Sequence, residues 1–157
     1  MPLFDLLQFC RELPARRNKG ALLLTPDPRE QRTCAAQIAA AAGAVHFDVL
    51  DAFQADAALT GRLAGFSSDD FLRLVSAQRV PLLIVSGLEF LLAAWLSQGS
   101  PKDVKRQFCQ QIELWDGRDN PAFLLVTQQD AIFAGYEPVR YKGSPIVIPL
   151  SETQAIS

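Results

Sequence analysis

Three places in the chain carry side chains that could act on an anionic ligand. Arg32 and Thr33 are adjacent near the start of an alanine-rich segment, where a guanidinium beside a hydroxyl could hold an anion. Ser86 follows an apolar run, and Glu89 comes three residues later with a carboxylate that could serve as a general base. Thr127 ends another apolar run. If the fold gathered these residues, they would combine anion binding with proton transfer.

The stretch from Gly20 to Gly43 has the layout of a phosphate-binding loop, with a strand, a turn and a helix in succession. The loop motif G-x-x-x-x-G-K-[ST] aligns its last two positions with Arg32 and Thr33. The same alignment puts Pro26 and Gln31 at the two glycine positions. The sequence therefore has the frame of a nucleotide-binding site without the residues that carry out its chemistry.

The composition is that of an ordinary globular chain with one domain. The 157 residues are 49% hydrophobic and 20% charged, and a chain of this length can bury a core without disulfide or metal staples. The net charge of −2 argues against a nucleic-acid surface spread over the whole molecule, but it allows a local basic patch. Asp5, Arg11 and Glu12 interrupt the apolar residues of the first segment, which is therefore neither a signal peptide nor a membrane span. We expect a cytoplasmic protein that does not bind membranes.

The cysteines and the single histidine give no metal-site signature. Cys10, Cys34 and Cys109 lie at apolar positions of predicted helices, where a free thiol packs as a small hydrophobic side chain. We expect all three cysteines to be free and largely buried. The chain has no Cys-x-x-Cys pair, and the strand pattern around His46 favours an exposed side chain over a catalytic base. No metal and no other cofactor is expected.

Five apolar runs have the length and residue types of strands, and helical patterns separate most of them. The predicted strands cover residues 21–25, 45–50, 80–85, 122–127 and 144–150. The predicted helices cover residues 2–13, 28–42, 51–78, 88–96 and 101–115. The segment 51–78 is predicted as two helices, with a break near Gly65 and with Ser67 or Ser68 as the N-cap of the second. Residues 131–143 have no clear period. This alternation predicts an α/β fold, a three-layer sandwich around a mostly parallel five-stranded sheet.

Ligands of parallel sheets bind beyond the carboxyl ends of the strands. These ends fall at residues 25–27, 86–89 and 127–129, and they resemble in order and spacing the P-loop, Walker B and sensor positions of the AAA-like branch of P-loop ATPases. In that branch the Walker B strand ends in an acid that holds magnesium, with a glutamate nearby that polarises water. Ser86 stands at the first of these positions and Glu89 at the second, and Thr127 stands at the polar sensor position.

The chain also resembles the small P-loop protein of BREX anti-phage systems. The features that they share are the short length, the lack of a helical lid domain and the run of residues 84–92. The resemblance implies one degenerate P-loop NTPase-like domain over residues 1–157. Residues 1–19 would form an amphipathic entry helix and a basic connector, and residues 20–150 would form the core. It also implies the strand order 5-1-4-3-2, with residues 21–25 in the centre.

Departures from the family pattern bear on the chemistry. A working P-loop surrounds phosphate oxygens with successive backbone N–H groups and adds a lysine. Pro26 and Pro28 have no N–H to offer. Asp27 and Glu30 add negative charge beside a triphosphate, and Ser86 is a poor magnesium ligand compared with a carboxylate. We therefore expect a pseudo-ATPase that does not hydrolyse nucleotides.

The sequence supports three hypotheses about function, of which we favour the first. This is a non-catalytic ATPase-like binding or assembly module in a bacterial multi-protein complex, such as an anti-phage defence system, with protein partners or further copies of the same chain. The second is an enzyme, or a nucleotide- or anion-binding protein, that uses the strand ends around Arg32 and Glu89. Glu89 would be the base, and Arg32 or Arg140 would bind the anion. The third is a nucleic-acid-binding subunit with a local basic patch.

The candidate interaction residues are of two kinds. Aromatic side chains in or near predicted loops can anchor an interface, although packing against the core is the alternative. These aromatics are Phe66, Phe133 and Tyr136. Cations gathered on one surface can bind an anionic partner. These cations are Arg16, Arg17, Lys19 and Arg140, with Lys102, Lys105 and Arg106 as further candidates.

Overall fold

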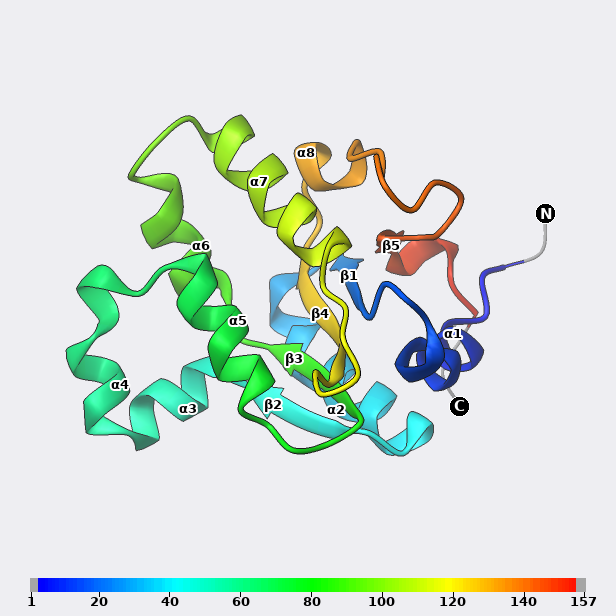
Figure 1. Cartoon of the computed structure of the whole chain (residues 1–157), viewed down its shortest axis with the longest axis horizontal. Coiled ribbons are helices and arrows are strands. Elements are labelled where there is room, and N and C mark those ends of the chain that lie inside the picture. The colour runs from blue at the N-terminus through cyan, green and yellow to red at the C-terminus, as the bar shows by residue number, and fades with distance from the viewer. Residues whose placement is uncertain (1–2, 155–157) are drawn as a thin grey trace.

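A parallel five-stranded sheet runs through the molecule in the order β2-β3-β4-β1-β5, and the computed structural model describes residues 3–154 (Figure 1). The strands are β1 (Gly20–Thr25), β2 (Val45–Asp48), β3 (Leu82–Ser86), β4 (Ala122–Gln128) and β5 (Val147–Pro149). This order is the one that the family resemblance implies. The centre of the sheet, however, is β4, and β1 lies between β4 and β5. The expectation that residues 21–25 form the central strand is therefore wrong by one position.

The residue types of the strands follow their places in the sheet. Every residue of β1 and β3 is buried, as is expected of strands that helices cover on both faces. The edge strand β2 is only partly buried, and Val45 is 46% exposed. The other edge strand, β5, is short and ends in Pro149, which cannot donate to a neighbouring strand.

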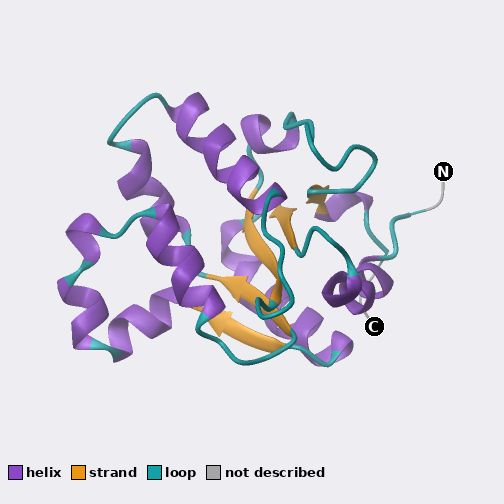
Figure 2. Ribbon diagram, viewed as in Figure 1, coloured by secondary structure: helices purple, strands orange, loops and turns teal. Residues whose placement is uncertain are grey.

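Helices cover both faces of the sheet (Figure 2). On one face lie α1 (Leu6–Glu12) and α2 (Gln31–Ala42), and on the other lie α3 (Val49–Ala55), α4 (Ala57–Gly61), α5 (Ser68–Ser76), α6 (Glu89–Leu96), α7 (Pro101–Glu113) and α8 (Ala131–Ala134). Short 3₁₀ turns are η1 (Leu13–Ala15), η2 (Pro28–Glu30), η3 (Leu63–Gly65) and η4 (Leu150–Glu152). Within residues 3–154, no helix combines the length and the apolar character needed to cross a membrane.

Two separate cores result from the alternation of side chains along the strands. In β1, Leu22 and Leu24 face the core under α3 and α5–α8, whereas Ala21 and Leu23 face the core under α1 and α2. The larger core is rich in aromatic rings, and Phe71 at its centre is fully buried. The sheet between two helical layers confirms the predicted α/β class with a parallel five-stranded sheet.

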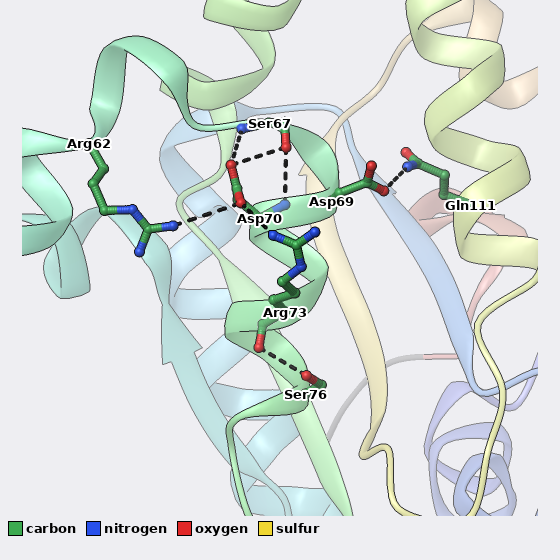
Figure 3. A network of polar contacts seen from close by, with 7 residues as sticks. All are labelled: Arg62, Ser67, Asp69, Asp70, Arg73, Ser76 and Gln111. Atoms are coloured by element: carbon green, nitrogen blue, oxygen red, sulfur yellow. Dashed lines mark hydrogen bonds and ion pairs between the residues drawn. The ribbon is translucent and has the colours of Figure 1, made fainter.

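The start of α5 shows how local sequence sets an element boundary (Figure 3). Ser67, one of the two predicted candidates, is the N-cap, and it forms a capping box with Asp70 in which each side chain accepts a hydrogen bond from the other residue's backbone N–H, at 3.2 and 2.9 Å. The hydrogen bonds from Ser67 lower the pKa of Asp70, and the nearby charge of Arg73 acts in the same direction. Asp69 accepts a hydrogen bond from Gln111 at 2.8 Å, which ties α5 to α7.

Several predicted boundaries differ from the structure. The helical segment predicted in two pieces over residues 51–78 is broken at Asp56 as well as near Gly65, because the Asp56 side chain accepts hydrogen bonds from the N–H groups of Ala58 and Leu59 and starts α4. The strand predicted over residues 45–50 ends at Asp48, because the Asp48 side chain accepts a hydrogen bond from the Asp51 N–H and starts α3. The unpatterned residues 131–143 contain α8, which is too short to show a helical period and is capped by Asp130. The first helix begins at Leu6 and not in the first residues of the chain. Residue 2 of that predicted helix lies outside the described residues.

Candidate functional site

The loop after β1, at the carboxyl edge of the sheet, is not built as a phosphate cradle. The carboxylate of Asp27 accepts a hydrogen bond from the Arg29 N–H at 2.9 Å and pairs with the Arg29 guanidinium at 3.0 Å. The hydrogen bonds from the Arg29 side chain and backbone hold the pKa of Asp27 below its usual range. Pro26 and Pro28 provide no N–H. An incoming phosphate would therefore find no N–H at Pro26 or Pro28, and the Arg29 N–H already bonded to Asp27. It would also meet the negative charges of Asp27 and Glu30.

Arg32 and Thr33, the candidates for anion binding, have separate environments. The Arg32 guanidinium forms an ion pair with Asp51 on α3, although the Arg32 side chain is 67% exposed. Thr33 is exposed and lines a cleft of about 420 Å³ with Cys34, Leu150 and three further residues of the η2–α2 segment. The two side chains therefore do not act as a pair in the way that a P-loop lysine and its hydroxyl neighbour do.

Ser86, at the position of the magnesium-binding acid, is fully buried in a small polar cluster. Its hydroxyl donates to the Asp48 carboxylate at 2.8 Å and lies 2.7 Å from Nε2 of His46. Because serine has one hydroxyl proton, His46 must be the donor in the second contact, with its proton on Nε2. The expectation of an exposed His46 is therefore wrong: the ring is half-buried and joins β2 to β3. Gly87 follows with φ +74°, and a Cβ there would lie 2.7 Å from Asp48.

Glu89 and Thr127 are the two predicted site residues that the structure brings together. The Thr127 hydroxyl donates to Glu89 Oε1 at 2.9 Å, and the Gln128 N–H lies 3.3 Å from the same oxygen. Thr127 is buried at the end of β4, and half-buried Glu89 is the acid in the first turn of α6. This carboxylate therefore links β4 to the start of α6, where the helix dipole favours negative charge.

A cleft of about 370 Å³ lies beside the Glu89–Thr127 pair and is lined by residues of α6, α7, β4 and α8. Among the described residues that line it, Lys105 is the one cation, and Asp130 forms an ion pair with it. Burial raises the pKa of Asp130, but hydrogen bonds from Lys105 and from the backbone N–H groups of Phe133 and Ile132 outweigh this effect and leave it lowered. The charges of Lys105 and Asp130 therefore neutralise each other within this cleft.

The opposite, amino edge of the sheet gathers a different set of predicted residues. Two adjoining clefts, of about 550 and 400 Å³, share Pro14, Lys19 and Arg118 and lie at the loops that precede β1, β3, β4 and β5. We call them together the cationic cleft. Its cations are Arg16, Arg17, Lys19, Arg79, Arg118 and Arg140. The predicted patch at residues 16–19 is therefore part of a larger surface.

Arg79 and Arg118 are members of the cationic cleft that sequence reasoning missed. A signal for Arg118 exists in the strand order that the resemblance implies, because neighbouring parallel strands β1 and β4 put their preceding loops at the same edge. The other proposed cations do not join this surface. Lys105 lines the carboxyl-edge cleft, and neither Lys102 nor Arg106 lines the cationic cleft.

A buried carboxylate fixes the loop that carries Arg140. Glu113, which is 1% exposed, accepts hydrogen bonds from the Tyr136 hydroxyl at 2.6 Å and from the backbone N–H groups of Val139, Arg140 and Tyr141. Burial raises the pKa of Glu113, but these hydrogen bonds outweigh it and leave the pKa lowered. The pKa of Tyr136 is raised by burial and by the hydrogen bond to the carboxylate. Tyr136, a candidate interaction residue, thus has a structural partner.

The two phenylalanines proposed as interface anchors are core residues. Phe66 is 4% exposed, packs edge-on against Phe53 with ring centroids 5.0 Å apart, and accepts a hydrogen bond from the Trp95 indole on its carbonyl. Phe133 is 2% exposed in the same core, with the Lys105 ammonium 5.6 Å from its ring centre. The loop that carries Phe66 and the helix α8 that carries Phe133 both fold back onto the larger core. These rings offer no surface to a partner, so the alternative of core packing applies.

The cysteines are free and buried, as predicted. Burial raises the pKa of Cys10 and of Cys109 to about 12 and also raises the pKa of Cys34. These thiols remain protonated at neutral pH and are weak nucleophiles, because the thiolate is the reactive form. None of the three is a candidate catalytic residue.

No protein-family model matches the chain, and no curated protein is significantly similar to it. Within residues 3–154, no three His, Cys, Asp or Glu side chains are grouped so that they could hold a metal ion. Function is therefore inferred from the geometry and charge of the two edges of the sheet.

Proposed function

We propose that the chain is a non-catalytic ATPase-like domain that serves as a binding and assembly module in a larger protein complex. The observation that carries this proposal is that the groups at the carboxyl edge already have partners within the chain. Asp27 occupies a loop N–H, Arg32 pairs with Asp51, and Ser86 is held by its two neighbours on β2. A triphosphate would have to break these contacts before it gained any of its own.

The negative charge at the carboxyl edge also argues against the binding of a triphosphate there. Asp48 ends β2, and Asp27, Glu30 and Asp51 lie in the loop and first turns that follow β1 and β2. Catalysis of phosphoryl transfer depends on positive groups and donors arranged around the transferring phosphate. A fold that resembles a P-loop ATPase but lacks these catalytic groups is what we would expect of a domain that serves as a binding surface. The resemblance to the BREX protein favours a bacterial defence complex as its setting.

The alternative of an enzyme centred on Arg32 and Glu89 receives less support from the geometry. Arg32 pairs with α3, whereas Glu89 accepts its hydrogen bonds from the end of β4. A general base and an anion-binding cation would need to face one substrate, within hydrogen-bond reach of the groups they serve. Here the two residues have separate partners on separate elements.

The test of the proposal is a calorimetric titration of the purified protein with ATP and magnesium up to millimolar concentrations. We expect no saturable heat, for wild type and for Arg32→Ala alike. Saturable binding that Arg32→Ala abolishes would overturn the proposal, because it would show that the guanidinium leaves Asp51 to act as the P-loop lysine does. A thermal-shift titration with the same two proteins provides an independent readout of binding.

A further inference from the structure

Charge is segregated within the molecule. The six cations that line the cationic cleft are accompanied there by two acids, Asp116 and Asp119, which leaves a formal charge of +4. The whole chain carries −2, so the remainder of the molecule carries −6. A concentrated positive surface on a negatively charged protein attracts anions to one place and repels them elsewhere.

The cations of this surface form no ion pairs with the described part of the chain, residues 3–154. The five ion pairs among residues 3–154 use cations that all lie outside the cleft, namely Arg29, Arg32, Arg62, Arg73 and Lys105. Inside it, Arg16 donates to the Ser144 hydroxyl at 3.0 Å, and the Lys19 ammonium donates to the Gly117 carbonyl at 2.9 Å. These acceptors are neutral, so they orient the cations and leave their charge available.

The loops that carry the cations are held in place by buried polar groups. Asn18 is 3% exposed, and its side-chain amide donates to the carbonyls of Ile112 and Glu113 at 2.9 Å each. The Glu113 carboxylate in turn binds the backbone around Arg140. The end of α7 therefore fixes both the segment before β1 and the loop before β5. A surface ordered in this way loses little conformational entropy when it binds a ligand.

We propose that the cationic cleft binds the sugar-phosphate backbone of a nucleic acid, independently of the function proposed for the carboxyl edge. Five of its six cations are arginines, whose planar guanidinium groups match phosphate oxygens in a bidentate geometry. The cations come from four separate loops, so a single small phosphate cannot contact them all, whereas a polymer with regularly spaced phosphates can. Phosphate contacts carry no sequence information, and binding is therefore independent of base sequence.

The experiment measures fluorescence anisotropy of labelled single-stranded and duplex oligonucleotides over a range of salt concentrations. The test variant is Arg118→Gln/Arg140→Gln, and the matched control, with the same change in charge, is Lys102→Gln/Arg106→Gln. All four side chains are exposed, so both variants should fold, which circular dichroism verifies. We expect the cleft variant to bind roughly tenfold more weakly or worse. The slope of log K against log salt should fall by about one for each phosphate that the variant no longer neutralises.

The control should bind like wild type, and Arg118→Lys/Arg140→Lys should keep most of the salt slope while binding more weakly, because lysine retains the charge without the fork. Whichever oligonucleotide binds more tightly identifies the strand form that the cleft prefers. Three results would overturn the proposal: no binding by wild type at low salt, equally weakened binding in the cleft and control variants, or displacement of the oligonucleotide by poly-glutamate of the same length and charge. The last result would assign the cleft to an acidic protein.

Discussion

The carboxyl and amino edges of the sheet use their charged groups in opposite ways. At the carboxyl edge, Arg32 and Lys105 each form an ion pair with a carboxylate from a neighbouring element. At the amino edge, the cations of the cationic cleft face solvent without such a pair among the described residues. A charged group that is paired within the protein must break that pair before it binds a ligand, whereas an unpaired charged group on an ordered surface is available to a ligand. The family resemblance draws attention to the first edge, and the charges point to the second.

The largest effect that we predict is the loss of stability in Glu113→Gln, a substitution that acts on the amino edge of the sheet. Glu113→Gln removes a buried carboxylate and sets an amide NH₂ against backbone donors, which should destabilise the protein by about 3 kcal/mol. It should also weaken binding at the cationic cleft, because the loop around Arg140 loses its anchor. Urea unfolding measures the first effect. A decrease in stability below about 0.5 kcal/mol would contradict the structural role of this carboxylate.

The same residue predicts a pH dependence. The pKa of Glu113 is lowered in the folded protein from an ordinary value of 4.5, so its contribution to stability is fully present above that value. The contribution disappears as the pH falls through the folded pKa, where the carboxylate becomes protonated. We therefore expect the stability of wild type to fall more steeply between neutral and strongly acidic pH than the stability of Glu113→Gln. Parallel profiles would contradict the lowered pKa.

A smaller effect is expected at the carboxyl edge from Ser86→Ala. The change leaves Asp48 Oδ2 and His46 Nε2 without their shared partner, and we expect destabilisation by about 1–2 kcal/mol. Nucleic-acid binding at the amino edge should be unchanged, which makes this variant the complement of Glu113→Gln. Thr33→Ala, at an exposed position of α2, is the matched control and should change stability by less than about 0.5 kcal/mol. Equal free energies of unfolding for Ser86→Ala and Thr33→Ala would show that the polar cluster around Ser86 does not contribute to stability.

The smallest predicted effect concerns Glu89. Glu89→Gln keeps a carbonyl oxygen that can accept from Thr127 and from the Gln128 N–H, so stability should change by well under about 1 kcal/mol. Assembly with partners should also persist. If Glu89 were a general base, the same substitution would typically lower a reaction rate by about 10²–10⁴-fold. Loss of biological activity with folding and assembly intact would therefore contradict the pseudo-ATPase proposal.

The sequence predicted those parts of the fold that depend on local patterns. The buried strands β1, β3 and β4 have apolar runs that match their fully covered places in the sheet. The N-cap of α5 could likewise be narrowed to Ser67 or Ser68 from their residue type and the acids that follow, and the structure shows that it is Ser67. The end of β2 could not, because an apolar residue at position 50 continues the strand pattern while the Asp48 side chain starts a helix.

The functional surfaces were less predictable, because they depend on contacts between distant segments. Phe66, in a short connection, and Phe133, in the one-turn helix α8, both pack into the core, and only the tertiary fold determines this packing. Ser86 and Glu89 are three residues apart, yet each forms its contacts with a different neighbouring strand. Arg118 joins Lys19 only through the adjacency of β1 and β4. A pattern along the chain identifies single residues, whereas their grouping requires the sheet.

Because the cationic cleft is built from segments that are far apart in the sequence, it can form only late in folding. Its walls come from residues 14–19, 78–81, 116–121 and 140–141. These segments meet only after β1 and β4 have paired and the loop before β5 has docked on α7. During synthesis the chain grows from its N-terminus, so residues 14–19 leave the ribosome long before their partners. A nascent chain therefore carries scattered cations but no assembled surface, and the ability to bind a polyanion becomes a late marker of complete folding.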